Sequence, residues 1–189
     1  HFCAYLAYQT NTNFSYVRQK KQITYIDNYL SHLKKEAEIC FIYENEYTDK
    51  NYMDDFSTYY VNCFTFYKKT TSRIHFFKYS EKRDLKEEFK LALNSKDSIF
   101  KSKNYLGFIV IRPIPKTFLA RVCLKPFHLD KNNRLKKYYL TKKYGISLFG
   151  ISLQVESIAF QEQDKVLSAC ATTSLWSFYH AHKNLCHDM

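Results

Sequence analysis

Glycine and proline are scarce in this chain, with three residues of each among 189. Glycine is the residue that lets a loop approach a phosphate group closely or adopt a positive φ, so phosphate-binding loops are nearly excluded. Neither of the common nucleotide-binding patterns, GxGxxG and GxxxxGK[ST], occurs in the sequence. We therefore expect no nucleotide site of these types and no cofactor.

Long apolar runs and closely spaced cysteines are also missing. No run approaches the roughly 20 apolar residues that a membrane-spanning helix requires, so we expect no membrane partner. The six cysteines stand far apart without a CxxC pair, and no leader with a charged and an apolar region is found. These features favour a cytoplasmic protein with free thiols. Because the sequence begins with His1, we expect a piece of a longer protein.

Acidic residues are nearly absent from residues 101–150, which carry twelve Lys or Arg and a single Asp. This excess equals the net charge of the whole chain, +11, and such a concentration predicts an anionic partner. Between residues 125 and 145 the basic side chains alternate with tyrosines, which can stack on exposed bases while lysines neutralise phosphates. A solvated hairpin tip is the alternative. The candidate anion-binding residues are Lys131, Arg134, Lys136, Lys137, Lys142 and Lys143.

The apolar pattern predicts an α+β fold with a mainly antiparallel sheet, because mixed helices and strands precede several consecutive strands and one long helix. Residues 1–10 are expected to form a strand or a buried terminal segment, and residues 129–145 a basic loop or hairpin tip. Helices are predicted from Thr24, after Asp49 and after Ser80, and strands at 39–47, 73–79, 105–115, 117–124 and 151–156. On the second helix, Tyr52, Phe56, Tyr59, Tyr60 and Cys63 recur at helical spacing, which favours a core face over a base-stacking platform.

The segment from Phe160 to Leu185 has the clearest chemical pattern. Asp164 or Ser168 can cap a helix, which places Cys170 within its first two turns. The free N–H groups and dipole at that end stabilise a thiolate, the nucleophilic form of cysteine. Upstream, Gln163 can offer its side-chain NH₂ to an oxyanion that forms beside the sulfur. A small buried hydrophobe is the alternative for Cys170, and an ordinary loop amide for Gln163.

This arrangement resembles the nucleophile segment of papain-like and C39-like cysteine peptidases, with Gln163, Cys170 and, loosely, Trp176 at the matching positions. The resemblance implies hydrolysis of a peptide or isopeptide bond by acyl transfer to Cys170, with a peptide or protein as the substrate. Gln163 stands one position further from the cysteine than is usual in the family, and Ala171 replaces the usual glycine. The likeness covers residues 160–185 only.

A cysteine peptidase also needs a histidine base, which the family takes from a strand well downstream of the helix, whereas this sequence ends at Met189. His180 and His182 lie roughly 15 to 18 Å along the helix from Cys170, beyond contact. The base is therefore His75, His128 or a histidine outside this chain. We expect an α+β domain at 1–159, with a basic segment at 116–145, and an incomplete peptidase-like domain at 160–189 that is inactive by itself.

The remaining candidates each have a structural alternative. His75 faces away from Ile74 and Phe76 in its predicted strand, toward solvent or a cleft, where it is either the base or a structural histidine. Arg112 and Arg121 are expected to pair with acidic groups near Glu162 and Asp164. The tail residues His180, His182, Cys186, His187 and Asp188 are metal-ligand types, but a solvated helix end is the preferred interpretation, and no metal site is expected.

Three functions follow from these patterns. The first is a cysteine peptidase. The second is a non-catalytic basic module that binds nucleic acid or an acidic protein through residues 125–145. The third is a structural subunit in which Cys170 is buried at an interface.

Overall fold

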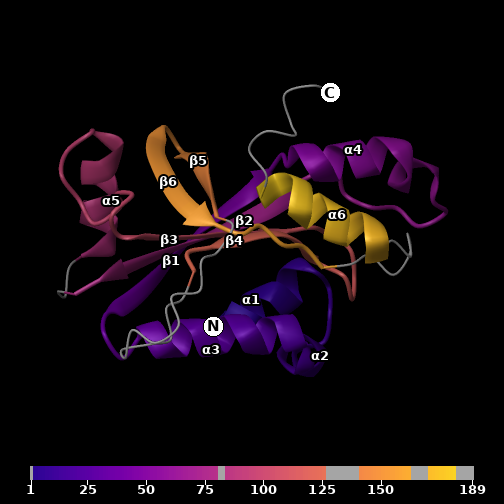
Figure 1. The fold of residues 1–189 in the computed structure, drawn as a ribbon, viewed down its shortest axis with the longest axis horizontal. Coiled ribbons are helices and arrows are strands. Elements are labelled where there is room, and N and C mark those ends of the chain that lie inside the picture. The colour runs from indigo at the N-terminus through magenta and orange to yellow at the C-terminus, as the bar shows by residue number, and fades with distance from the viewer. Residues whose placement is uncertain (1, 81–83, 127–140, 163–169, 182–189) are drawn as a thin grey trace.

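The computed structural model describes residues 2–80, 84–126, 141–162 and 170–181, with the backbone alone for 170–173 and 181. It confirms the α+β fold: four antiparallel strands in the order β1-β2-β3-β4 form the central sheet, and a two-stranded sheet, β5-β6, lies beside it. In Figure 1, α1, α2 and α3 lie on one face of the central sheet, and α4, α5, α6 and the β5-β6 hairpin lie on the other.

The first face is covered by α1 (Phe2–Gln9), α2 (Phe14–Gln19) and α3 (Lys21–Leu33). Phe2 and Leu6 of α1 are buried, so the buried terminal segment predicted at residues 1–10 is confirmed, while the strand alternative is wrong. The helix predicted from Thr24 is confirmed as α3, which begins three residues earlier. Apolar side chains of these helices pack against one face of the sheet to form the first core cluster.

The central sheet consists of β1 (Glu38–Tyr47), β2 (Thr71–Tyr79), β3 (Tyr105–Ile111) and β4 (Leu119–Leu124). All seven residues of β3 are buried, which confirms that its unbroken apolar run is covered on both faces. At Gly107 of β3 the register with β2 shifts, and the backbone takes a φ of +125°. This position allows β3 and β4 to approach closely, because a Cβ there would lie 2.0 Å from the Cys123 carbonyl oxygen.

The second of the predicted helices is α4 (Lys50–Thr58). It begins as predicted, because the Asp49 side chain accepts a hydrogen bond from the Tyr52 N–H at 3.2 Å. A short 3₁₀ turn, η1 (Tyr60–Asn62), follows it. The predicted aromatic core face is confirmed, since Tyr52, Phe56 and Tyr60 are buried together with Ile114. The Tyr60 ring packs edge to face against the rings of Tyr59 and Tyr67, as expected of a packed aromatic core.

The third of the predicted helices is α5 (Leu85–Leu93), and it differs from the prediction at its start. Its N-cap is Asp84, whose carboxylate accepts from the Lys86 N–H at 2.9 Å, and not Ser80. Phe89 packs partly buried against the second core cluster as predicted, but Leu85 and Leu93 are exposed. A buried carboxylate, Glu88, takes an inward position instead because it accepts a hydrogen bond from the Ile99 N–H at 2.8 Å.

The hairpin consists of β5 (Lys142–Leu148) and β6 (Ile151–Ser157). β6 shows the predicted alternation of buried and outward residues. Part of the predicted basic loop at 129–145 is corrected, because residues 142–145 belong to β5, while residues 127–140 lie outside the described part of the chain. Phe149 and Gly150 form the turn, both with positive φ, as a two-residue hairpin loop requires.

Candidate functional site

The last helix, α6 (Cys170–Ala181), contains the cysteine that the sequence places near a helix start, and Cys170 is its first described residue. Gln163, the predicted oxyanion donor, lies outside the described residues, as does Asp164, and the side chain of Cys170 does too. The backbone of Cys170 is helical, while its position in the first turns of the helix and its role as nucleophile stay predictions.

Trp176 attaches α6 to the same face of the sheet as the hairpin, where it packs against the second core cluster. The His180 ring stacks on the Trp176 ring with centroids 3.8 Å apart, and its Nδ1 lies 2.9 Å from the Trp176 carbonyl oxygen. The Tyr144 hydroxyl of β5 donates to the His180 carbonyl oxygen at 3.4 Å. These contacts hold α6 against β5. The His180 side chain is partly buried, so it does not lie at a fully solvated helix end.

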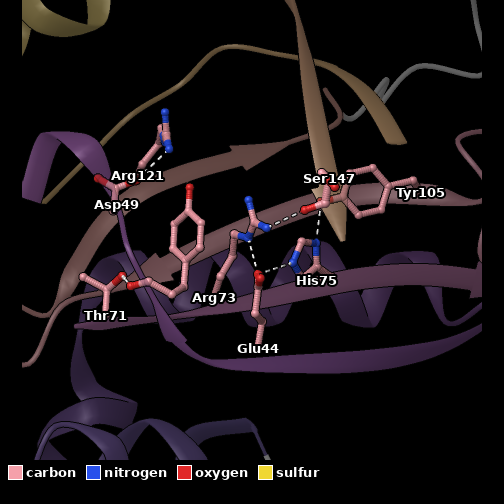
Figure 2. Close-up of polar contacts among 9 residues, drawn as sticks. Glu44, Asp49, Thr71, Arg73, His75, Tyr105, Arg121 and Ser147 are labelled. Atoms are coloured by element: carbon pink, nitrogen blue, oxygen red, sulfur yellow. Dashed lines mark hydrogen bonds and ion pairs between the residues drawn. The ribbon is translucent and has the colours of Figure 1, made fainter. Parts of the chain in front are cut away.

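His75 faces away from Ile74 and Phe76 as predicted, but it is buried and points neither to solvent nor to an open cleft. Its Nδ1 lies 2.8 Å from the Tyr105 hydroxyl oxygen and its Nε2 lies 3.3 Å from Glu44 Oε2 (Figure 2). A carboxylate can only accept, so Nε2 carries the proton of the neutral ring and Nδ1 accepts from Tyr105. Both ring nitrogens are thus satisfied within the protein.

Arg73 lies next to this histidine and joins the hairpin to the sheet. Its Nε donates to Glu44 Oε2 at 2.7 Å, and its Nη2 donates to the Ser147 carbonyl oxygen of β5 at 2.8 Å (Figure 2). The guanidinium carbon lies 4.0 Å from the centre of the Tyr47 ring, a cation–π contact. Arg73 is 6% exposed, so its charge depends on Glu44 and on these dipoles for stabilisation.

The surroundings of this buried charge network, Glu44, Arg73, His75 and Tyr105, change the acidity of its members. Burial lowers the pKa of His75 against the opposing effect of Glu44, and burial raises the pKa of Tyr105. Burial alone would raise the pKa of Glu44, but hydrogen bonds and charges from His75 and Arg73 outweigh it and lower that pKa. A neutral histidine between a tyrosine and a carboxylate could pass protons, yet Tyr105 and His75 are at most 1% exposed, which leaves no place for a substrate.

These shifts predict that acid weakens the fold. In the unfolded chain His75 binds a proton near pH 6.5, whereas burial lowers its pKa in the folded state, so the unfolded chain binds more protons as the pH falls. The free energy of unfolding should therefore be highest above pH 6.5 and should decline from there toward the lowered pKa of His75. Protonation of Glu44, whose pKa is also lowered, adds a further loss at more acidic pH.

The measurement is urea unfolding at a series of pH values between 5 and 8, followed by circular dichroism. His75→Gln keeps hydrogen-bonding groups but does not titrate, so its unfolding free energy should change less with pH than that of the parent. His180→Gln is the matched control, because burial lowers the pKa of His180 as well and its contribution has the same sign. An unchanged slope in His75→Gln would contradict the assignment to His75.

A second group of charges holds the segment that leads toward α6. Arg112 donates to the carbonyl oxygens of Thr117 at 2.6 Å and of Glu162 at 3.0 Å, while the Glu162 carboxylate pairs with Lys20. Arg112 therefore binds Glu162 through a hydrogen bond to its backbone carbonyl oxygen, whereas the predicted pairing was with an acidic side chain. Arg121 Nη2 pairs with Asp49 Oδ2 at 2.6 Å, a partner that was not predicted, while Asp164 lies outside the described residues.

Residues 160–162 continue the sheet beyond β4. Phe160 and Val122 exchange two backbone hydrogen bonds, at 2.7 and 3.1 Å, and the Glu162 N–H donates to the Leu119 carbonyl oxygen at 3.0 Å. The domain boundary between residues 159 and 160 stays a prediction, but these contacts cross it. They fix the direction in which the chain leaves the sheet eight residues before Cys170.

Of the predicted anion-binding residues, only two are described. Lys142 and Lys143 lie at the start of β5, with Lys143 exposed and Lys142 partly exposed. Lys131, Arg134, Lys136 and Lys137 lie outside the described residues. His128 also lies outside them, so the structure gives no position for this alternative base.

Sequence reasoning missed Glu44, Arg73 and Tyr105. Arg73 was read only as the first residue of a strand, and the available signal was its spacing of two residues from His75, which puts both side chains on one face of β2. The described residues contain no group of three or more His, Cys, Asp or Glu placed to hold a metal ion. Among the helices described, none combines the length and the apolar character needed to cross a lipid bilayer.

Comparison with protein-family models, with curated proteins and with solved structures finds no match for this chain, so the chemistry of the site has to be derived from its own residues.

Proposed function

We propose that this protein is a cysteine peptidase-like hydrolase that cleaves a peptide or isopeptide bond by acyl transfer to Cys170. The proposal is supported by the helical backbone at Cys170 together with the sequence pattern before it, in which Asp164 or Ser168 can cap the helix and place the sulfur near the end that stabilises a thiolate. The four cysteines whose side chains are described, Cys3, Cys40, Cys63 and Cys123, are all free thiols, which fits a reducing, cytoplasmic setting.

The reaction would have two steps. The Cys170 thiolate attacks the substrate carbonyl carbon, and the negative charge that develops on the oxygen is stabilised by the Gln163 side-chain amide. The C–N bond breaks, the amine leaves with a proton from a histidine, and water then hydrolyses the thioester. The candidates for this histidine are His75, His128 and a histidine outside this chain.

For His75 to act as that base, its ring would have to leave both Tyr105 and Glu44. Since His75 is fully buried and its nitrogens are both engaged, the structure favours a structural role for it. His128, or a histidine outside this chain, then supplies the base. A base from outside this chain would agree with the expectation that the chain alone is inactive.

The test is alkylation with iodoacetamide across pH, with each modified cysteine identified by peptide mass spectrometry. Cys170 should react at pH values below the pKa of a free cysteine, which is about 8.5. Burial raises the pKa of Cys40 and of Cys123 to about 12, so these thiols should stay unmodified and serve as internal controls. A Cys170 that titrates at or above the free value, or that does not react in the folded protein, would remove the nucleophile and favour the interface subunit.

A second candidate is a basic module that binds nucleic acid or an acidic protein through residues 125–145. It is favoured by the twelve basic residues and single Asp of residues 101–150, and by the accessible position of Lys142 and Lys143 on β5. Such binding should weaken steeply as salt rises, and neutralising Lys142 and Lys143 should reduce it.

A further inference from the structure

Residues 61–70, which comprise the end of η1 and the loop that leads to β2, expose two phenylalanine rings to water. Phe64 and Phe66 have relative exposures of 112% and 91%, and Val61 beside them is 56% exposed. Large apolar side chains gathered on a monomer surface usually mark a place where another molecule binds. Neither ring belongs to the aromatic core cluster that lies under the loop.

The base of this loop is fixed by that core cluster. The Tyr52 hydroxyl of α4 donates to the Lys68 carbonyl oxygen at 2.8 Å, and the rings of Tyr60 and Tyr67 meet edge to face at 5.1 Å. Lys69 lies over the Phe56 ring, with its nitrogen 5.7 Å from the ring centre. Because residues 67–69 are attached to α4 and η1, the loop that carries Phe64 and Phe66 is anchored directly after these rings, which reduces the ordering penalty on binding.

The charge around these rings has one sign. No Asp or Glu occurs between Asp55 and Glu81, while Lys68 and Lys69 follow Phe66 after one residue and are exposed. The other exposed side chains of the loop are polar, namely Asn62, Thr65 and Thr70. This composition differs from a lipid-inserting surface, which presents a broad apolar face.

We propose that the loop at residues 61–70 binds single-stranded nucleic acid, with bases stacked on Phe64 and Phe66 and phosphates paired with Lys68 and Lys69. Flat rings without polar atoms stack on any base, and adjacent lysines neutralise the backbone, which is the combination used for single strands. A duplex keeps its bases paired and offers no free face to these rings. The residues of this proposal are other than residues 125–145, and the proposal does not depend on Cys170.

The experiment measures fluorescence anisotropy of a labelled oligothymidylate of about 15 nucleotides, titrated with the full chain at about 50 mM salt. The double variant Phe64→Ala/Phe66→Ala should bind at least about tenfold more weakly, because each lost stacking contact is worth roughly 1–3 kcal/mol. Phe64→Tyr/Phe66→Tyr should bind like the parent, since tyrosine stacks equally well. In Lys68→Ala/Lys69→Ala the slope of log affinity against log salt should shrink by about 1.4.

Lys142→Ala/Lys143→Ala is the matched control for the other basic surface and should retain the phenylalanine-dependent binding. The proposal is overturned if the parent does not bind the oligonucleotide, or if Phe64→Ala/Phe66→Ala binds as tightly as the parent. Binding that disappears in Lys142→Ala/Lys143→Ala alone would assign nucleic acid to residues 125–145. Capture of the parent, but not of the phenylalanine variant, by phosphatidylserine-containing vesicles without oligonucleotide binding would assign the loop to a lipid surface.

Discussion

Gly107→Ala should destabilise the protein by at least about 4 kcal/mol, an exceptional loss for a single substitution. The new Cβ would lie 2.0 Å from the Cys123 carbonyl oxygen and 2.9 Å from the Leu124 α-carbon. Both are backbone atoms of β4, so no side-chain rotation relieves the clash and the two strands must separate. The φ of +125° is a further penalty for any residue with a side chain.

Thermal unfolding followed by circular dichroism measures this effect, with a fall in Tm of roughly 8–16 °C for a chain of this size. Gly145→Ala is the matched control, because a Cβ at that exposed position of β5 would have no atom within 4 Å. It should change the free energy of unfolding by no more than about 0.5 kcal/mol. If the two variants melt within a few degrees of each other, the close approach of β3 and β4 at Gly107 is wrong.

Arg112→Met should lower the free energy of unfolding by about 2–5 kcal/mol, since it removes the donor for two buried carbonyl oxygens. Arg112 is 4% exposed, and its Nε and Nη2 donate to the carbonyl oxygens of Thr117 and Glu162, respectively. Methionine fills a similar volume, so the loss reports on the hydrogen bonds and on the charge opposite Glu162, with little contribution from a cavity.

Urea unfolding gives this value, and Arg112→Lys distinguishes charge from geometry. Lysine keeps the positive charge but has no planar fork, so it should recover less than half of the loss. Full recovery by lysine would mean that charge alone matters at this position. A methionine variant as stable as the parent would show that water satisfies the Thr117 and Glu162 carbonyl groups.

Local patterns were sufficient for most of the elements. The unbroken apolar run of β3, the alternation in β6 and the aspartate before α4 each have one physical interpretation, and the structure agrees with all three. The fold class followed from the order of these elements. A helix that includes Cys170 was also predicted, from good helix formers behind candidate caps, and residues 170–181 are helical.

The misses share a cause, which is that the deciding partner lies far away in the sequence. The first ten residues contain too few polar positions to show a helical period, so packing of Leu6 in the core decides their structure. His75 is buried because Glu44 and Tyr105, on two other strands, satisfy its ring. No local pattern reports a cross-strand partner of this kind, and the same holds for the bonds between Phe160 and Val122.

The pairing of residues 160–162 with β4 determines where the chain can be cut to study the sheet without α6. A truncation after residue 159 would remove the backbone partners of Val122 and Leu119 and expose a strand border with free N–H and C=O groups. Such a border recruits other chains and causes aggregation. Extending the truncated protein through Glu162 would retain these bonds, and this is the shorter version that we expect to remain monodisperse.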